Sequence, residues 1–424
     1  MLFRTRPSQL AGDVHIPGSK SHTIRGVLLA SLAAGESRLI DPLASSDTEA
    51  AVRVYGQLGA EFELGEREWR IRGTGLDLQI PDQPLDVGNS GTTMNVSLGT
   101  TSLIKGGALT LTGDHQIQRR PSAPLVQALQ ALGASIKDLC GTGCPPYEVA
   151  GGLRGGKVSL IAKSSQYVTG LLFACPLAPE DTEIEVPILE ERPYVQMSLD
   201  WLDFQGIELQ REGLQHFWIK GNQSFKPFER KIPADFSTAT FFLVAGAMAG
   251  NTVTCHGLDM SDSQSDKLVV RFLQEMGAEV TITGDAITVS APNGLEGASL
   301  DMNDCPDALP MMAVCGTMAK GETILHNVAH ARIKETDRIA VMCQELRKLG
   351  ADIEEREDGL VIHQSTLKGE SVQGHHDHRV VMSLALAGTM ATGETTVDTA
   401  EAAAVTVPTF QTMVETLGGT IEAI

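Results

Sequence analysis

The stretch QLGAEFEL, residues 57–64, recurs five more times along the chain. The other copies are ALGASIKDL at 131–139, the degenerate DFQGIELQ at 203–210, EMGAEVTI at 275–282, KLGADIEE at 348–355 and the weaker TLGGTIEA at 416–423. Their glycines are separated by 74, 73, 71, 73 and 68 residues, a period too regular for unrelated loops. Glycine after an apolar helix end takes the left-handed backbone that stops a helix. Each copy therefore predicts a helix end followed by a strand.

A second repeated feature has the same period. A helix of small residues, a glycine and a Thr/Val/Ile strand occur together at Gly35, Gly107, Gly250, Gly321 and Gly393, and CPLAPEDTEIEV near Asp181 is the copy without the glycine. Each unit thus reads strand, helix, strand, helix. Units of about 70 residues are too short for ordinary domains, so several must share a core. We expect six units in two lobes of three, with the break in the polar passage 221–233.

Composition limits the possible functions. The chain has 424 residues, which predicts two to three domains, and 33 basic against 53 acidic residues give a net charge of −20. Such a charge repels nucleic acid and acidic lipid, so we expect neither as a partner, and any anionic ligand needs a local cationic pocket. The seven cysteines contain no C-x-x-C pair, which favours a reduced, cytoplasmic protein. We find no signal segment or membrane span, and we expect a soluble monomer.

Two motifs in the first hundred residues suit an anion. PGSKSHTIR at 17–25 places Lys20, Ser21 and Arg25 near a predicted helix start, where free backbone N–H groups favour negative charge, although a solvated basic cap is the favoured explanation for this segment alone. VGNSGTTM at 87–94 resembles a glycine-rich loop that lets a phosphate or carboxylate approach the backbone. A nearby Walker-like stretch, 151–157, lacks the required Ser/Thr and precedes a strand, so it is rejected.

Three further sets of polar residues follow. GDHQIQRRP at 113–121 offers paired arginines, whose forked donors suit planar anions, and KSSQY at 163–167 has two hydroxyls that could equally be a plain N-cap. In the second half, DMNDCPDA at 301–308, RIKETDR at 332–338 and HHDHR at 375–379 combine carboxylates with cations. The second of these also reads as a salt-bridged first helical turn. The histidine spacing lacks usual ligand geometry, so we expect no metal.

Taken together and in order, PGSKSHTIR, GNSGTT, SSQY, CPDA, IKETDR and DHR resemble the enolpyruvyl transferase family, over essentially the whole chain. The resemblance implies an α/β (α+β) fold, a two-lobed inverted α/β barrel of six β-α-β-α-β-β repeats with helices inside. The lobes would be 18–231 and 1–17 plus 232–424. A two-strand hinge would lie near 17–19 and 229–233, closing the lobes over substrate.

The resemblance also implies an activity, the transfer of the carboxyvinyl group of phosphoenolpyruvate to the 5-hydroxyl of shikimate 3-phosphate, in the chorismate pathway of aromatic amino acid biosynthesis, without a cofactor. The motifs supply the cations that two phosphorylated carboxylates need. By resemblance, Asp307 would act as base, Lys20 would aid proton transfer, and Glu335 would serve the methylene carbon. The implied substrate-binding residues are Ser21, Arg25, Gly91, Thr92, Arg120, Ser164, Ser165, Gln166, Tyr194, Lys334, Arg338, His378 and Arg379.

Three positions depart from the family's pattern. Asn95 and Val405 stand where the family has an arginine and a lysine, and Glu191 stands where it has a serine. Each lost charge-assisted contact costs about 1.5–3 kcal/mol. The departures could mean weak phosphoenolpyruvate binding, compensation by Arg119 or Arg192, or a different acceptor. Glu191 near a phosphate site would be repulsive.

Three alternatives remain open. A paralogous carboxyvinyl transferase with another phosphorylated acceptor would keep Lys20, Asp307 and Glu335 while explaining the altered binding residues. A catalytically dead binding protein is disfavoured by that intact trio. An RNA-processing relative is disfavoured by the charge of −20 and the absence of basic and aromatic stripes.

Overall fold

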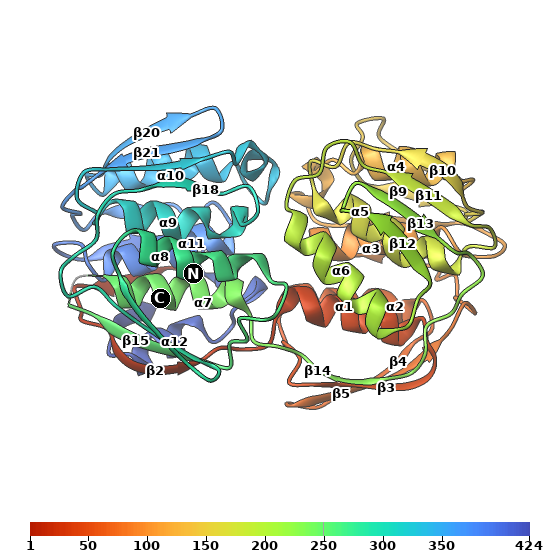
Figure 1. Ribbon diagram of the computed structural model, residues 1–424, viewed down its shortest axis with the longest axis horizontal. Coiled ribbons are helices and arrows are strands. Elements are labelled where there is room, and N and C mark those ends of the chain that lie inside the picture. The colour runs from red at the N-terminus through yellow and green to blue at the C-terminus, as the bar shows by residue number, and fades with distance from the viewer. Residues whose placement is uncertain (249) are drawn as a thin grey trace. The chain divides into compact units, whose positions relative to one another are not determined.

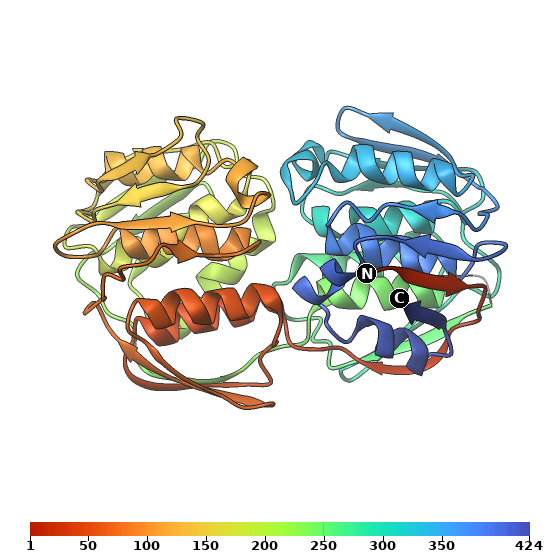
Figure 2. The same cartoon turned by 180° about the vertical axis from the view of Figure 1, so that it is seen from behind.

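The computed structural model describes residues 1–248 and 250–424 of the chain. Contacts divide it into two compact units. The middle unit comprises Gly18–Ile232, and the terminal unit comprises Met1–Pro17 together with Pro233–Ile424. The chain therefore passes between the units twice, at residues 17–18 and 232–233 (Figures 1 and 2).

The repeating element is a β-α-β-α-β-β segment that forms a four-stranded sheet. In one such sheet, ordered β6-β7-β9-β8, the first two strands run parallel and the other pairs run antiparallel. Its segment consists of β6 (Leu85–Asp86), α3 (Gly91–Thr101), β7 (Leu109–Thr112), α4 (Ala123–Ala131), β8 (Ile136–Asp138) and β9 (Tyr147–Val149). The described residues form six four-stranded sheets, three in each unit, as the repeat predicts.

The other elements of the middle unit follow the same plan. They are α1 (Lys20–Ser31), β3 (Ala34–Ile40), α2 (Ser46–Gln57), β4 (Glu61–Leu64), β5 (Glu68–Thr74), β10 (Gly156–Ser159), α5 (Ser165–Ala174), β11 (Thr182–Glu185), α6 (Arg192–Phe204), β12 (Leu209–Glu212), β13 (His216–Ile219) and β14 (Glu229–Lys231), with short 3-10 turns η1 (Ile117–Arg119) and η2 (Cys175–Leu177).

The terminal unit repeats the plan three times. Its strands are β1 (Phe3–Arg6), β2 (Ala11–His15), β15 (Thr252–His256), β16 (Glu279–Thr283), β17 (Ala286–Ser290), β18 (Ser299–Asp301), β19 (Glu322–His326), β20 (Asp352–Arg356), β21 (Gly359–His363), β22 (Ser371–Val372), β23 (Thr395–Val397) and β24 (Thr420–Ala423). Its helices are α7 (Phe236–Ala247), α8 (Leu268–Glu275), α9 (Leu309–Gly316), α10 (Arg338–Lys348), α11 (His378–Gly388) and α12 (Phe410–Thr416), with 3-10 turns η3 (Ser265–Lys267), η4 (Pro306–Ala308), η5 (Ala329–Ile333) and η6 (Ala400–Val405).

Before each crossing, one strand pairs with a strand from the other half of the sequence. β2, which precedes the first crossing, pairs in parallel with β15 of the terminal unit (Figure 1). β14, which precedes the second crossing, pairs in parallel with β3 of the middle unit. β1 completes the sheet that also holds β24, so both chain ends lie in one sheet. Each unit is thus closed by a strand that is distant in sequence.

The repeated glycines have the backbone that the sequence predicts. Gly59, at the end of α2, has a φ of +111°, and Gly350, at the end of α10, has a φ of +90°. Only glycine takes such angles without strain. The other copies, Gly133, Gly206, Gly277 and Gly418, also have positive φ. The sequence prediction of helix ends at these positions is confirmed.

One helix of each repeat is buried on nearly all sides. In α3 every residue is buried, and the same holds for α9 and α11. α5 and α7 are buried along almost their whole length, so the sheets enclose central helices. Polar residues at the first turns of these central helices are therefore held rigidly, because the helices that carry them are fixed in the two cores.

Candidate active site

The start of α1 carries a lysine and a buried carboxylate partner. Lys20 is the first residue of α1, and its Nζ lies 3.1 Å from Oδ2 of Asp47 at the start of α2. The two side chains are only 13% and 5% exposed. Desolvation strengthens such a pair and fixes the ammonium position. Asp47 was not singled out by the sequence analysis, although its place in a helical first turn was readable.

Arg25 lies further along α1 and contacts two of the other predicted residues. Its guanidinium donates to Ser198 Oγ at 3.1 Å, to the Ser21 carbonyl at 2.9 Å and to the Tyr194 carbonyl at 3.1 Å. Burial lowers the pKa of Arg25 to about 10, which keeps it charged at neutral pH. The structure therefore brings Ser21, Arg25 and Tyr194 together.

A second group in the middle unit surrounds the first turn of α3. Gly91 begins α3, and a methyl group on it would lie 2.5 Å from a terminal nitrogen of Arg120, so the guanidinium occupies the space that the missing side chain leaves. Gln166 Nε2 donates to Thr92 Oγ1 at 3.3 Å. The structure thus places Gly91, Thr92, Arg120 and Gln166 side by side.

Asn95 belongs to this second group. Its Nδ2 donates to Gln166 Oε1 and to the Gly91 carbonyl, both at 2.9 Å. Asn95 is 5% exposed. It therefore orients the Gln166 amide so that the Gln166 nitrogen points to Thr92. In this chain the position supplies a positioning contact and no charge.

Ser164 and Ser165 form the start of α5. Ser164 is the N-cap, and its Oγ accepts from the Gln166 N–H at 3.4 Å, as a capping interpretation predicts. Oε2 of Glu191 accepts from the Ser165 N–H at 3.0 Å, from Ser165 Oγ at 2.9 Å and from Ser164 Oγ at 3.4 Å. The Glu191 carboxylate thus approaches the two serines and is bound by their donors.

The terminal unit places its charged residues around Arg338. Arg338, the first residue of α10, is 1% exposed and contacts three carboxylates. Its Nη1 lies 2.8 Å from Asp307, its Nη2 lies 2.6 Å from Glu335, and its Nε lies 2.8 Å from Asp377. Burial acts to lower the pKa of Arg338, but these three charges outweigh it and raise the pKa well above its usual value.

Arg379 completes this terminal-unit cluster. Its Nη2 lies 2.8 Å from the other oxygen of Asp307, so two arginines hold that carboxylate. Asp377 is fully buried and caps α11 by accepting from the Arg379 N–H at 2.8 Å. His378 is also buried, with Nδ1 4.0 Å from Asp377. Lys334 lies at the end of η5, next to Glu335 in sequence, and is partly exposed.

Asp266 is a buried carboxylate near this cluster that the sequence analysis missed. It lies in η3 and accepts a hydrogen bond from Ser237 Oγ at the start of α7. Burial, and next the charge of Asp307, raise the pKa of Asp266 to about 6. Its sequence context, Gln-Ser-Asp-Lys, is typical of a turn, so no simple signal marked it.

The two clusters supply the components of acid–base chemistry on anions. In the terminal unit, two carboxylates are positioned by buried arginines, so each keeps a fixed direction. In the middle unit, a desolvated lysine, two arginines and three helix starts offer positive charge and N–H donors. Such a set suits a reaction in which a hydroxyl loses a proton while a phosphate departs.

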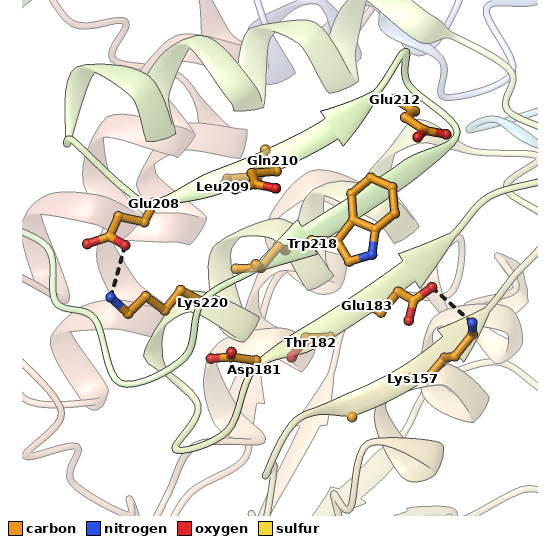
Figure 3. Close-up of a pocket in the computed structure, with 12 residues that line it drawn as sticks. Lys157, Asp181, Thr182, Glu183, Glu208, Leu209, Gln210, Glu212, Trp218 and Lys220 are labelled. Carbon is orange, nitrogen blue, oxygen red and sulfur yellow. Dashed lines mark hydrogen bonds and ion pairs between the residues drawn. The ribbon is translucent and has the colours of Figure 1, made fainter.

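No metal-binding group of three or more His, Cys, Asp or Glu residues occurs among residues 1–248 and 250–424. No helix in the same described part of the chain is long and apolar enough to cross a membrane. A surface depression over β10, β11, β13 and β12 contains none of the predicted site residues (Figure 3). Its lysines, Lys157 and Lys220, are paired with Glu183 and Glu208 at 2.9 Å, which leaves them poorly placed to bind an anion.

Comparison with known proteins defines the class. The family model described as EPSP synthase (3-phosphoshikimate 1-carboxyvinyltransferase) matches residues 4–414. The chain is 47% identical over 421 residues to the 3-phosphoshikimate 1-carboxyvinyltransferase of Acetivibrio thermocellus, covering 99% of both chains, and 36% identical to that of Methanococcus maripaludis, covering all of both.

Solved structures agree with this match. The chain is similar to EPSP synthase from Acinetobacter baumannii, with a TM-score of 0.84, 28% identity and 99% coverage of both chains. The enolpyruvyl transferase NikO from Streptomyces tendae shares the fold, with a TM-score of 0.82 at 18% identity, covering 99% of this chain and 98% of that one. The fold and the clusters therefore define a carboxyvinyl-transferring enzyme with the two-lobed α/β fold.

Within that class, the chain belongs to the EPSP synthase family, the 3-phosphoshikimate 1-carboxyvinyltransferases. The family resemblance and the fold class expected from the sequence are thereby confirmed.

Proposed function

We propose that this enzyme transfers the carboxyvinyl group of phosphoenolpyruvate to the 5-hydroxyl of shikimate 3-phosphate and releases inorganic phosphate. The observation that carries the proposal is the arrangement around Arg338, which holds Asp307 and Glu335 within 2.8 Å of one buried guanidinium. A base and an acid fixed to the same cation are what an addition followed by an elimination requires. The full-length match to the 3-phosphoshikimate 1-carboxyvinyltransferases supports the same reaction.

The proposed reaction has two steps. In the addition, Asp307 accepts the proton of the 5-hydroxyl, the hydroxyl oxygen bonds to carbon 2 of phosphoenolpyruvate, and the methylene carbon gains a proton from the protonated form of Glu335. In the elimination, Glu335 takes a proton back from that carbon, the double bond reforms and the bond between carbon 2 and the phosphate oxygen breaks. The departing phosphate takes the proton held by Asp307, so both carboxyl groups return to their starting states. Lys20, fixed by Asp47, stabilises negative charge and aids proton transfer. Protons and electrons balance without a cofactor.

The two substrates are assigned separate sets of residues. We assign the acceptor to Ser21, Arg25, Ser164, Ser165, Tyr194 and Lys334. We assign phosphoenolpyruvate to Gly91, Thr92, Arg120, Gln166, Arg338, His378 and Arg379. The contacts of Arg25 with Ser21 and Tyr194, and of Gln166 with Thr92, support this grouping. Because ligand oxygens would replace carboxylates on Arg338 and Arg379, binding would also release Asp307 to act as a base.

The proposed reaction draws on residues of both units, so we also propose a hinge at the crossings near 17–19 and 229–233. The strands β2 and β14, which flank the crossings, are each fixed by parallel pairing in one unit. Bending is therefore confined to the few residues that follow each of these strands at the crossings. We propose that the enzyme acts as a monomer in the cytoplasm, and light scattering after size-exclusion chromatography tests the monomer.

Steady-state phosphate release tests the function. We expect release when phosphoenolpyruvate and shikimate 3-phosphate are both present, and none when either is omitted or when unphosphorylated shikimate is supplied. Folded protein that is inactive with this pair would contradict the proposal. Turnover with a nucleotide or a phosphorylated cyclitol in place of shikimate 3-phosphate would favour the paralogous transferase. The altered positions Asn95, Glu191 and Val405 are the reason for testing that alternative.

A further inference from the structure

Glu191 places its carboxylate at the start of α5. Its Oε2 receives three hydrogen bonds, from the Ser165 backbone N–H, the Ser165 hydroxyl and the Ser164 hydroxyl, at 3.0, 2.9 and 3.4 Å. The residue is 2% exposed. One oxygen with three converging donors at a helix start has the coordination of a bound phosphate or sulfate oxygen. We call this group of donors the serine cradle.

The carboxylate reaches the cradle from another element. Glu191 immediately precedes α6, whereas the cradle is the start of α5. Ser164 already caps α5 by accepting from the Gln166 N–H, so Glu191 is a second acceptor at this helix start, and it carries a negative charge. Its charge is also felt by Tyr167, whose pKa rises to about 12 through burial, with Glu191 contributing and the charge of Arg120 opposing.

The backbone of Glu191 is held in an uncommon conformation. Its φ of +56° lies in the left-handed region, which residues other than glycine and asparagine seldom adopt. Such a conformation persists only where surrounding contacts maintain it. Here the hydrogen bonds to the cradle are contacts that can do so, and they couple the start of α6 to the start of α5.

The position of Glu191 conflicts with the acceptor assigned above. Ser164 and Ser165 are proposed to hold the phosphate of shikimate 3-phosphate, and two anions cannot share the same three donors. We propose that Glu191 competes with the acceptor's phosphate for the serine cradle. The Glu191 carboxylate must leave the cradle before a phosphorylated acceptor can bind. This inference rests on the proposed function and makes Glu191 a specificity-determining residue.

The surroundings of the cradle suit a displaced carboxylate. Lys163, which immediately precedes the cradle in sequence, is exposed to solvent. Rotation of the Glu191 side chain toward solvent therefore does not leave a buried, unpaired charge. Because only the fraction of molecules with a vacated cradle binds phosphate, the apparent affinity for the acceptor is lower than the intrinsic affinity by that fraction.

Kinetics of three variants test the competitor. Glu191→Ser removes the carboxylate and Glu191→Gln keeps its shape without its charge. Glu180→Ser, an exposed carboxylate of the same unit, controls for net charge. We expect Glu191→Ser to lower the KM for shikimate 3-phosphate about tenfold to a hundredfold, the range for loss of one charge-assisted contact. Glu191→Gln should fall between it and the parent, the KM for phosphoenolpyruvate should change much less, and Glu180→Ser should match the parent.

An unchanged or higher KM for shikimate 3-phosphate in Glu191→Ser would overturn the inference, because a competitor's removal cannot weaken the ligand. Circular dichroism of each variant establishes that it is folded, and Glu191→Gly, which suits the left-handed backbone, replaces the serine variant if that one is not. If no variant turns over, the proposed function fails. The inference is then tested by calorimetric titration of shikimate 3-phosphate, with tighter binding to Glu191→Ser expected and equal binding contradicting it.

Discussion

The carboxylates of the two clusters are held in different ways. In the terminal unit, Asp307 and Glu335 are bound by the arginines at 338 and 379, at distances of 2.6 to 2.8 Å. In the middle unit, Glu191 is bound by two serines and a backbone N–H. In the first arrangement, ligand oxygens can replace the carboxylates on the arginines, whereas in the second an anion already occupies neutral donors. Removing a charge from the terminal-unit cluster should therefore lower stability or turnover. Removing the charge of Glu191 from the serine cradle should instead strengthen binding of the acceptor.

Arg338→Met should have the largest effect. It leaves Asp377, which is fully buried, and two further carboxylates without their shared partner. Removing one partner of a buried ion pair costs about 3–5 kcal/mol, so we expect a loss of this size in urea unfolding, together with loss of turnover. Arg356→Met, on an exposed strand of the same unit, is the matched control. Equal stabilities of the two variants would show that the cluster contributes little.

Glu335→Gln separates chemistry from stability in the same cluster. The amide keeps an oxygen for Arg338 but cannot deliver a proton, so we expect kcat to fall about 10²- to 10⁴-fold while urea unfolding changes little. Rapid-quench measurement of product and calorimetric binding of phosphoenolpyruvate check this. Glu354→Gln, which removes an exposed carboxylate of the terminal unit, should behave like the parent. A rate near the parent's in Glu335→Gln would refute its role.

Asp266→Asn tests whether the raised pKa of Asp266, which lies near Asp307, makes stability depend on pH. Since the folded pKa of Asp266, about 6, lies above the ordinary value of 3.8, the folded state holds this proton more tightly than the unfolded chain. Stability from this group is therefore complete below pH 4 and is lost as pH rises toward 6, by about 3 kcal/mol. The asparagine variant should show a flatter pH dependence of unfolding over that interval. An unchanged slope would contradict the assignment, and Asp285→Asn, which is exposed, is the control.

Asn95→Ala should have a smaller effect, confined to the middle unit. It removes the donor that orients the Gln166 amide, and one neutral hydrogen bond contributes about 0.5–1.5 kcal/mol. We expect a severalfold rise in the KM for phosphoenolpyruvate with kcat nearly constant. The KM for shikimate 3-phosphate provides the internal comparison, and a larger change in that constant would show that Gln166 serves the acceptor.

Val405→Lys should have the smallest effect. Val405 ends η6 and is half-buried, so a lysine there can extend its charge toward solvent. We expect a modest decrease in the KM for phosphoenolpyruvate, and none for Val405→Met, which adds length without charge. Equal constants in the two variants would mean that this position does not face the substrate.

The fold was predictable because its repeat is marked by residues, above all glycines, whose backbone conformation depends on local sequence. Glycines such as Gly59 and Gly350 need positive φ, and their spacing defines the repeats. The strand exchange of β2 and β14 was less accessible, because strand pairing between distant segments leaves no local mark. Lys20 and Arg338, which the sequence analysis placed at helix starts, are the first residues of α1 and α10.

Partners of these residues were harder to predict. Asp47 and Asp266 are ordinary first-turn or turn carboxylates in the sequence, and only tertiary packing brings them to Lys20 and near Asp307. The sequence predicted that Glu191 would be repulsive near a phosphate site, but it did not predict where this side chain points. Its left-handed backbone, which directs the carboxylate onto the Ser165 N–H, cannot be read from the Glu-Glu-Arg-Pro context.

The most direct measurement is a phosphorus NMR time course of the purified enzyme with phosphoenolpyruvate and shikimate 3-phosphate. The account predicts that the two substrate signals decline together, while inorganic phosphate and one new phosphate monoester grow in equal amounts. Constant substrate signals, or phosphate that appears without shikimate 3-phosphate, would contradict it.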